Sequence, residues 1–311
     1  MAGRKGTSIT LVNGTRLRVT RLDSCGKIVY GDRNVGISDS FVSVSAKVNT
    51  SSTTAVQVKN ANGDILVNVP AVTSFSNYDL EIAFASVDPE LFSLITGQGV
   101  KYDALGNVSG FTVDSSVSLT GQGIALEIWA GAPGGDACDN TGATGSYGYV
   151  LFPFLQGGVL GDHTVNEGAI SFTITGVTSN DGAGWGVGPY KVEVGSDSNP
   201  AVLSTALSAT THELFAVVGV APPAAVSGTR PQLNPTATAV TAITPTAGAG
   251  HTENFSITGG GSGVGVWWDF GDGTWDYIVG TSTSHTYAAA GTYTVAASSN
   301  GTWVTHATTV A

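Results

Sequence analysis

Apolar side chains recur at every second position in several short segments of the chain. Within 78–84 they alternate with Asp79 and Glu81. The same alternation recurs at 124–128 around Glu127, at 172–174 and at 192–194. A period of two is that of a β-strand with one buried and one exposed face. Glycine accounts for 43 of the 311 residues and charged residues for only 11%, which favours turns and short strands over helices. The sequence therefore predicts a mainly β fold.

One short helix is expected at 88–97. Asp88 is a typical N-cap residue, Pro89 suits the first helical position, and Gly97 ends the pattern. The apolar residues of one helical face are Leu91, Leu94 and Ile95. This helix spans about two turns and interrupts a chain of strands.

The charge balance limits the classes of partner. The formal net charge is −11, so general binding to nucleic-acid phosphates is disfavoured, whereas a conduit along which DNA slides without sticking is compatible. Arg16, Arg18 and Lys27 lie in a basic N-terminal segment without an aromatic ladder or a nucleic-acid-binding motif. We expect this segment to pair with an acidic neighbouring subunit.

Composition changes near residue 230. Arg230 is the last basic residue of the chain, and 221–240 is rich in Pro, Ala, Ser and Thr. The sequence predicts a domain at 1–220, a linker at 221–240 and a second domain at 241–311.

Two cysteines, Cys25 and Cys138, allow at most one disulfide and match no zinc pattern, so we expect free thiols. No apolar run has the length of a signal peptide or of a membrane span. The chain is expected to be synthesised in a cytoplasm and not to associate with a membrane.

Motifs of catalysis are missing. The sequence has no nucleophile elbow, phosphate-binding loop, dinucleotide fingerprint or H-E-x-x-H motif. Asp269–Gly273 resembles an Asp-rich calcium loop but lacks its alternating ligands and distant Glu. We interpret it as a tight turn in which Asp272 bonds the backbone and the glycines supply positive φ. No catalytic residue, cofactor or metal is predicted, and an enzyme is not expected.

The C-terminal residues closely resemble the signatures of PKD-type immunoglobulin-like domains. The matching residues are Trp268, Asp269, Phe270, Gly271, Asp272, Gly273, His285, Tyr287, Gly291 and Tyr293. The resemblance implies a β-sandwich that binds or displays rather than catalyses. The segment 296–299, Ala-Ala-Ser-Ser, departs from the usual branched residues and predicts a thin core.

The first ~220 residues resemble a major tail tube protein of tailed bacteriophages with long non-contractile tails. The resemblance rests on the order of segments: a hairpin-like 19–32, the strand at 77–84, the helix at 88–98, Gly188-Pro189-Tyr190 and Pro222-Pro223. It implies a β-sandwich or barrel with one flanking helix, assembled as hexameric rings stacked into a tube in the virion tail.

The same resemblance implies the partners. They are further copies of the chain, tape measure and terminator proteins of the tail, and DNA that passes through the lumen without specific binding. The C-terminal domain would lie on the outside and contact the host cell surface. Asp79, Glu81 and Glu127 are the candidate lumen-lining residues, because each is expected to point outward from an alternating strand.

Three alternatives stay open from the sequence. A secreted adhesin or carbohydrate-binding protein would use Trp267, Trp275 and Trp303 to stack on sugar rings. A hydrolytic enzyme with a PKD accessory domain would need a catalytic constellation in 1–220. A capsid decoration protein belongs to the same structural class as a tail tube subunit.

Overall fold

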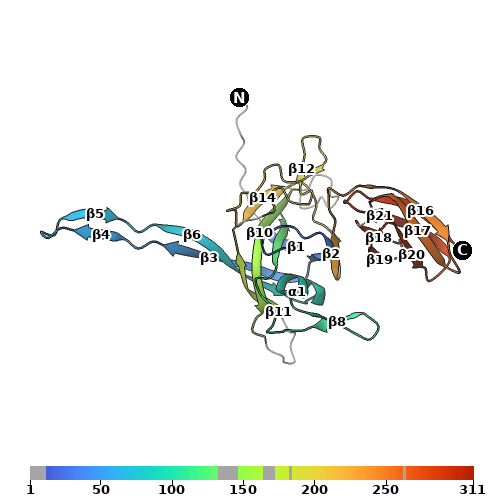
Figure 1. Ribbon diagram of the computed structural model, residues 1–311, viewed down its shortest axis with the longest axis horizontal. Helices are drawn as coiled ribbons and strands as arrows, with labels where there is room; N and C mark the ends of the chain where they lie inside the picture. Colours follow the sequence, from blue (N-terminus) through green and yellow to red (C-terminus); the bar gives the residue numbers. More distant parts are fainter. Residues whose placement is uncertain (1–11, 132–145, 164–171, 182–183, 262–263) are drawn as a thin grey trace. The chain divides into compact units, whose positions relative to one another are not determined.

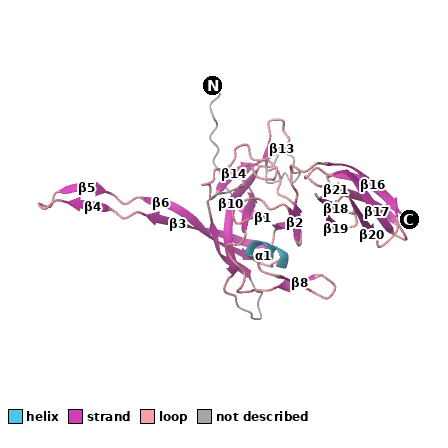
Figure 2. Cartoon of the chain, in the orientation of Figure 1, coloured by secondary structure: helices cyan, strands magenta, loops and turns pink. Residues whose placement is uncertain are grey.

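The computed structural model describes residues 12–131, 146–163, 172–181, 184–261 and 264–311. Strands make up 55% of the described residues and helix 3%, which confirms the predicted mainly β class. The chain divides into two compact units (Figures 1 and 2). The first unit comprises Met1–Ile28 and Gly36–Gly228, and the second comprises Val29–Val35 and Thr229–Ala311.

The first unit is built on one large antiparallel sheet. Its strand order is β1-β9-β10-β11-β6-β3, and β14 also pairs with β10. The bounds are β1 Val12–Leu22, β3 Phe41–Ser52, β6 Thr73–Phe84, β9 Gly123–Gly131, β10 Tyr147–Leu160, β11 Phe172–Ser179 and β14 Leu214–Val218. The sheet is open, so the barrel that the tail-tube resemblance offered as one option is not observed in this chain.

Three small hairpins accompany the sheet. They pair β4 (Val56–Lys59) with β5 (Ile65–Val69), β7 (Val100–Tyr102) with β8 (Val108–Phe111), and β12 (Glu193–Val194) with β13 (Pro200–Ala201). The turns at Asn60–Asp64 and Asp103–Asn107 are alike: an Asn or Asp side chain accepts backbone N–H groups, and a glycine at the fourth position has positive φ. An Asx residue and a glycine at this spacing favour a hairpin turn.

Helix α1 (Pro89–Thr96) is confirmed with the predicted ends. Asp88 Oδ1 accepts hydrogen bonds from the N–H groups of Glu90 (2.9 Å) and Leu91 (3.4 Å). Gly97 adopts φ 75°, and its N–H donates to Ser93 O at 2.8 Å. The helix thus begins and ends where the capping residues predict.

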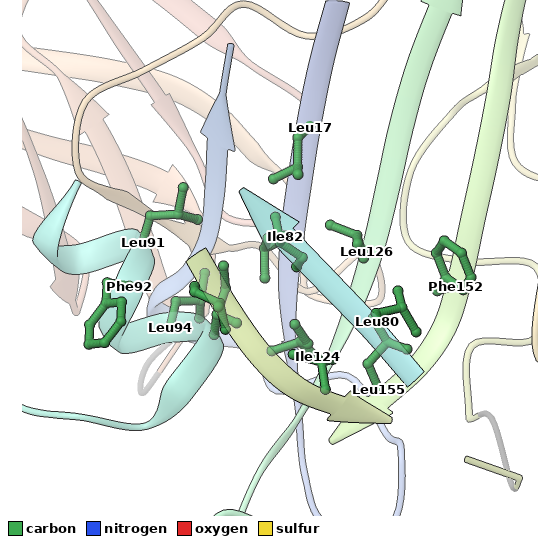
Figure 3. Packing of buried hydrophobic residues seen from close by; sticks show 14 of the residues in the cluster. Leu17, Leu80, Ile82, Leu91, Phe92, Leu94, Ile124, Leu126, Phe152 and Leu155 are labelled. Atoms are coloured by element: carbon green, nitrogen blue, oxygen red, sulfur yellow. The ribbon is translucent and has the colours of Figure 1, made fainter. Parts of the chain in front are cut away.

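Both faces of the central strands are buried. One face packs Leu17, Ile82, Ile124 and Leu126 together with α1 (Figure 3). The opposite face buries Trp129, Tyr149, Phe154 and Trp185 among its members. The strand at 124–128 therefore has no exposed face, in contrast to the expectation from its alternation.

The second unit is a sandwich of two antiparallel sheets. One has the order β16-β17-β20 and the other β19-β18-β21-β22. The bounds are β16 Val240–Ala247, β17 Thr252–Gly259, β18 Gly265–Asp269, β19 Trp275–Val279, β20 Ser282–Thr286, β21 Gly291–Ser298 and β22 Val304–Val310. Between the sheets lie Phe255, Trp268, Phe270 and Val295, while Ala297 confirms that small residues fill part of this core.

The boundary between the units falls between Gly228 and Thr229, inside the segment predicted as a linker. Within that segment, β15 (Thr229–Gln232) is already part of the second unit, which also contains most of β2 (Gly31–Ser38). In the described part of the chain, no helix is long and apolar enough to span a membrane.

Candidate functional site

A long two-stranded arm extends from the sheet of the first unit (Figure 1). Strands β3 and β6 pair from Phe41–Phe84 out to Ser52–Thr73, and β4 and β5 continue the ribbon to its tip. We call residues 50–76 the arm; all of them except Asn60 are exposed. An isolated two-stranded ribbon is marginally stable in water, so the arm lacks the packing that stabilises the rest of the unit.

The arm carries one apolar face near its tip. Val56 pairs with Val69 and Val58 pairs with Val67, so these four side chains share one face, which we call the valine face. Gln57 and Asn68 pair on the opposite face. Each of the four valines is about half exposed, between 45% and 52%. Contiguous apolar surface of this kind marks interaction sites in soluble proteins.

A polar chain holds the root of the arm. Tyr78 N donates to Ser179 Oγ (2.8 Å), Ser179 Oγ lies 2.8 Å from His212 Nδ1, and His212 Nε2 lies 2.7 Å from Asp181 Oδ1. The His212 ring also meets Phe75 edge-on, with centroids 5.0 Å apart. Residues from three separate segments thereby fix the direction in which the arm leaves the sheet.

Ser179, His212 and Asp181 are the residue types of a hydrolytic triad, but the serine is buried where a substrate cannot reach it. Ser179 is 1% exposed, and its Oγ already accepts the Tyr78 N–H. A nucleophile must reach a substrate carbonyl. The chain of contacts is therefore structural.

Two ionisable groups lie beside this root. Burial raises the pKa of Glu213, against the effect of its hydrogen bond with Tyr78. Burial and the Glu213 carboxylate raise the pKa of Tyr78. Both groups favour their neutral forms more than in water.

Two of the three predicted lumen acids lie on β6 near the root. Asp79 is partly exposed and faces Lys47 across the β3–β6 pair, and Glu81 is exposed and faces Ser45. Both point away from the core that Leu80 and Ile82 enter. Their exposure is compatible with the predicted role, which stays a prediction.

The prediction that Glu127 points outward is wrong. Glu127 is 0% exposed and accepts two hydrogen bonds from Arg18, at 2.5 and 2.6 Å, and one from Tyr149 Oη at 2.6 Å. The segment from Trp185 to Leu203 covers this face of β9, so the expected solvent side is a second core. Glu127 lines no lumen in this fold.

The same pair corrects the interpretation of the basic N-terminal segment. Arg18 is 6% exposed, and its guanidinium lies 3.4 Å from the Tyr190 ring centroid. Arg16 pairs with Asp39 at 2.8 Å within the chain, whereas Lys27 is exposed. Arg18 is therefore unavailable to a neighbouring subunit.

Burial and the Glu127 charge have opposite effects on the pKa of Arg18 but act in the same direction on the pKa of Tyr149. Burial alone would lower the pKa of Arg18, but the Glu127 carboxylate raises it above its usual value. Burial and Glu127 raise the pKa of Tyr149 well above its usual value. Arg18 therefore stays charged and Tyr149 stays neutral at ordinary pH.

In the second unit, the Asp-rich segment forms the predicted turn. Asp269 Oδ1 accepts from Gly271 N (2.9 Å), Asp272 Oδ1 accepts from Thr274 N (3.0 Å), and Gly271 and Gly273 have φ of 79° and 90°. Asp272 Oδ2 also accepts from His285 Nε2 at 2.8 Å. Burial would raise the pKa of Asp272, but the hydrogen bonds from Thr274 and His285 lower it to about 2.

The remaining signature residues are brought together around that turn. The His285 ring stacks on Phe270 with centroids 4.1 Å apart, and Tyr287 Oη donates to Phe270 O at 3.2 Å. Tyr293 stacks on Tyr287, and Gly291 begins β21. These residues connect the two sheets and build the sandwich.

Three tryptophans gather on the outer face of the β18–β19 sheet. Trp267 and Trp275 stack with centroids 4.8 Å apart, and Trp303 meets Trp267 edge-on at 6.0 Å. Arg230 lies 4.5 Å from the Trp275 centroid. Trp303 is 46% exposed, whereas the other two rings are partly buried.

The described residues contain neither a disulfide nor a cluster of metal ligands. Cys25 is exposed and forms no disulfide with a described residue, while Cys138 lies outside the described residues. Within the described ranges, no three His, Cys, Asp or Glu side chains gather where they could hold a metal ion.

The geometry of the second unit defines an immunoglobulin-like β-sandwich. A family model described as the PKD domain matches residues 229–304. The chain therefore carries a PKD domain at its C-terminal end, as its signature residues predict. A search of curated proteins finds no match to the chain.

Sequence reasoning missed the arm and the polar chain at its root. The arm had a usable signal, since alternating valines flank the turn residues Asn60–Asp64. The root had none, because Tyr78, Ser179 and His212 are remote in sequence and meet only in the folded sheet.

Proposed function

We propose that the chain is a virion structural protein, a tail tube subunit that assembles into stacked, hexameric rings and displays its PKD domain outward. The observation that carries the proposal is the arm with its exposed valine face. The order of segments in residues 1–220, similar to that of tail tube proteins, supports the same assignment.

Self-assembly gives the arm the packing that it lacks alone. Burial of the exposed half of each valine side chain contributes about 1 kcal/mol, and partner strands or sheets supply further contacts. We take a neighbouring copy of the chain as the partner, because the outer edge of β3, at one end of the open sheet, pairs with no strand of the described residues.

The assembly test places a charge on either face of the arm. Val58→Asp puts a carboxylate into the valine face, and Asn68→Asp puts the same charge on the opposite face of the same hairpin. Wild-type chain should form rings or tubes in negative-stain electron microscopy. Val58→Asp should leave folded monomers, and Asn68→Asp should assemble.

Two outcomes would overturn the proposal. One is a wild-type chain that stays at a monomer mass of 31.4 kDa at all concentrations. The other is equal assembly of both variants, which would exclude the valine face as the interface. Circular dichroism of each variant separates loss of assembly from loss of fold.

In the proposed tube, Asp79 and Glu81 line the lumen through which DNA passes. An acidic lumen lets DNA pass without binding, because a Lys or Arg exposed there would instead bind a DNA phosphate. The double variant Asp79→Lys, Glu81→Lys should form normal tubes yet slow DNA delivery in an infectivity assay. Normal infectivity with intact tubes would remove these two acids from the lumen.

The tryptophan cluster favours a second candidate function, recognition of a saccharide by the PKD domain. Indole rings stack on the apolar faces of sugars, and Trp303 offers an exposed ring. Retention on immobilised bacterial polysaccharide should be lost in Trp303→Ala. Tyr30→Ala, which removes an exposed aromatic ring outside the cluster, should bind normally. Equal retention of both variants would exclude the cluster.

A further inference from the structure

The tip of the arm carries an asparagine followed by glycine. The sequence has three such pairs, at Asn13, Asn62 and Asn300. In an Asn–Gly pair the glycine backbone nitrogen can attack the asparagine side chain, because glycine has no side chain to block it. The three sites differ in how the fold holds the reacting groups.

Asn62 is held least. It lies in an exposed turn, and its own N–H donates to Asn60 Oδ1, whereas no hydrogen bond joins its carboxamide to another described residue. Gly63 has φ 88°, and nothing lies within 4 Å of the place where its Cβ would be. The carboxamide is therefore free to rotate toward Gly63 N, which itself donates to Asn60 O at 3.0 Å.

Asn300 offers a matched contrast in the second unit. Its Oδ1 accepts from Thr302 N at 2.9 Å, and Gly301 N donates to Ser298 Oγ at 2.9 Å. Gly301 has φ 91° and the same empty surroundings as Gly63. The main difference is the hydrogen bond that holds the Asn300 carboxamide. Gly14, by contrast, lies within β1 and pairs with Ala130.

We infer that Asn62 is a site of spontaneous deamidation at the tip of the arm. Gly63 N bonds to the Asn62 side-chain carbonyl carbon, the carbon–nitrogen bond of the carboxamide breaks, and its NH2 leaves as ammonia with the proton that Gly63 N loses. Water then opens the cyclic imide to aspartate or isoaspartate. The new carboxylate is ionised at neutral pH, and isoaspartate adds one methylene to the backbone of the turn.

The consequence is a change of charge next to the valine face. Asp64 already accepts a hydrogen bond from Asn60 at the tip, so the product places a second carboxylate in the same turn. Two carboxylates in one turn repel each other, and the longer backbone of isoaspartate disturbs the β4–β5 pairing. The tip of the arm in the unassembled chain therefore gains negative charge over time.

The test compares two sites in one sample. The monomer fraction of the full chain is incubated at mildly alkaline pH, digested, and followed by mass spectrometry for the gain of about 1 Da at each asparagine. The peptide with Asn62 should convert roughly three- to tenfold faster than that with Asn300, because the latter must first break a hydrogen bond.

Two variants sharpen the comparison. Asn62→Gln should remove the fast-forming acidic charge variant seen by ion-exchange chromatography and leave only the slower conversion at Asn300, because glutamine cyclises far more slowly. Asn300→Gln should leave that variant unchanged. Equal rates at both sites, or an acidic form that appears at the wild-type rate in Asn62→Gln, would overturn the inference.

Discussion

Arg18 and Glu127 face each other across strands β1 and β9 and form a buried two-point ion pair. Trp129 and Tyr190 flank the guanidinium, and Tyr149 donates to the carboxylate. Every charge in the pair thus has partners. Loss of one partner leaves an uncompensated buried charge, which is among the largest single penalties in a protein.

Glu127→Gln should destabilise the first unit by about 3–5 kcal/mol because Arg18 then lacks a counter-charge. The free energy of unfolding, from denaturant titration, measures the loss. Glu81→Gln removes an exposed carboxylate, and its effect should stay within about 0.5 kcal/mol. The double variant Arg18→Met, Glu127→Leu should be more stable than Glu127→Gln. Equal stability of the two single variants would contradict the assignment of Glu127 to the core.

His212→Ala should loosen the root of the arm. It removes the ring that contacts Ser179, Asp181 and Phe75, at a cost of about 1–3 kcal/mol. Hydrogen exchange at the Tyr78 amide should accelerate, because its acceptor Ser179 Oγ loses its own anchor. His163→Ala, at an exposed position, should leave that amide unchanged. Unaltered Tyr78 protection in His212→Ala would mean that Ser179 alone holds the root.

Local patterns in the sequence were sufficient where neighbours along the chain decide the structure. Asp88, Pro89 and Gly97 fixed both ends of α1, and the Asp269–Gly273 turn followed from its Asx and glycine residues. In these segments the hydrogen bonds join residues a few positions apart. The predicted and observed structures therefore agree closely.

The errors arose where distant segments decide burial. The alternation around Glu127 predicts one exposed face, but the chain after Trp185 returns to cover that face and supplies a second core. In the folded sheet Arg18 lies opposite Glu127, where a cross-strand pair of opposite charges stabilises the sheet. Only the strand register, which the sequence did not provide, brings the two residues together.

Asp272 should make the second unit sensitive to acid. Its pKa is lowered from 3.8 to about 2 in the folded chain, so its contribution to stability is present above about pH 4 and is lost as pH falls toward 2. Solvent screening reduces that contribution to about 1 kcal/mol. Asp272→Asn should flatten this part of the stability–pH curve, measured by calorimetry. Asp276→Asn, an exposed acid on β19, should keep the wild-type slope. An unchanged slope in Asp272→Asn would remove His285 and Thr274 as the cause.

Alanine substitutions at Gly271 and Gly301 distinguish the cost of backbone strain from the cost of a steric clash. Both have positive φ, 79° and 91°, so an alanine at either position is disfavoured by about 1–2 kcal/mol. A Cβ on Gly271 would also lie 2.4 Å from Thr294 O on β21, whereas one on Gly301 would meet nothing within 4 Å. Gly271→Ala should therefore lower the unfolding free energy of the second unit by about 2–5 kcal/mol, and Gly301→Ala by the strain alone. If both variants lose the same stability, the turn at Asp269–Gly273 does not pack against β21 as closely as this contact requires.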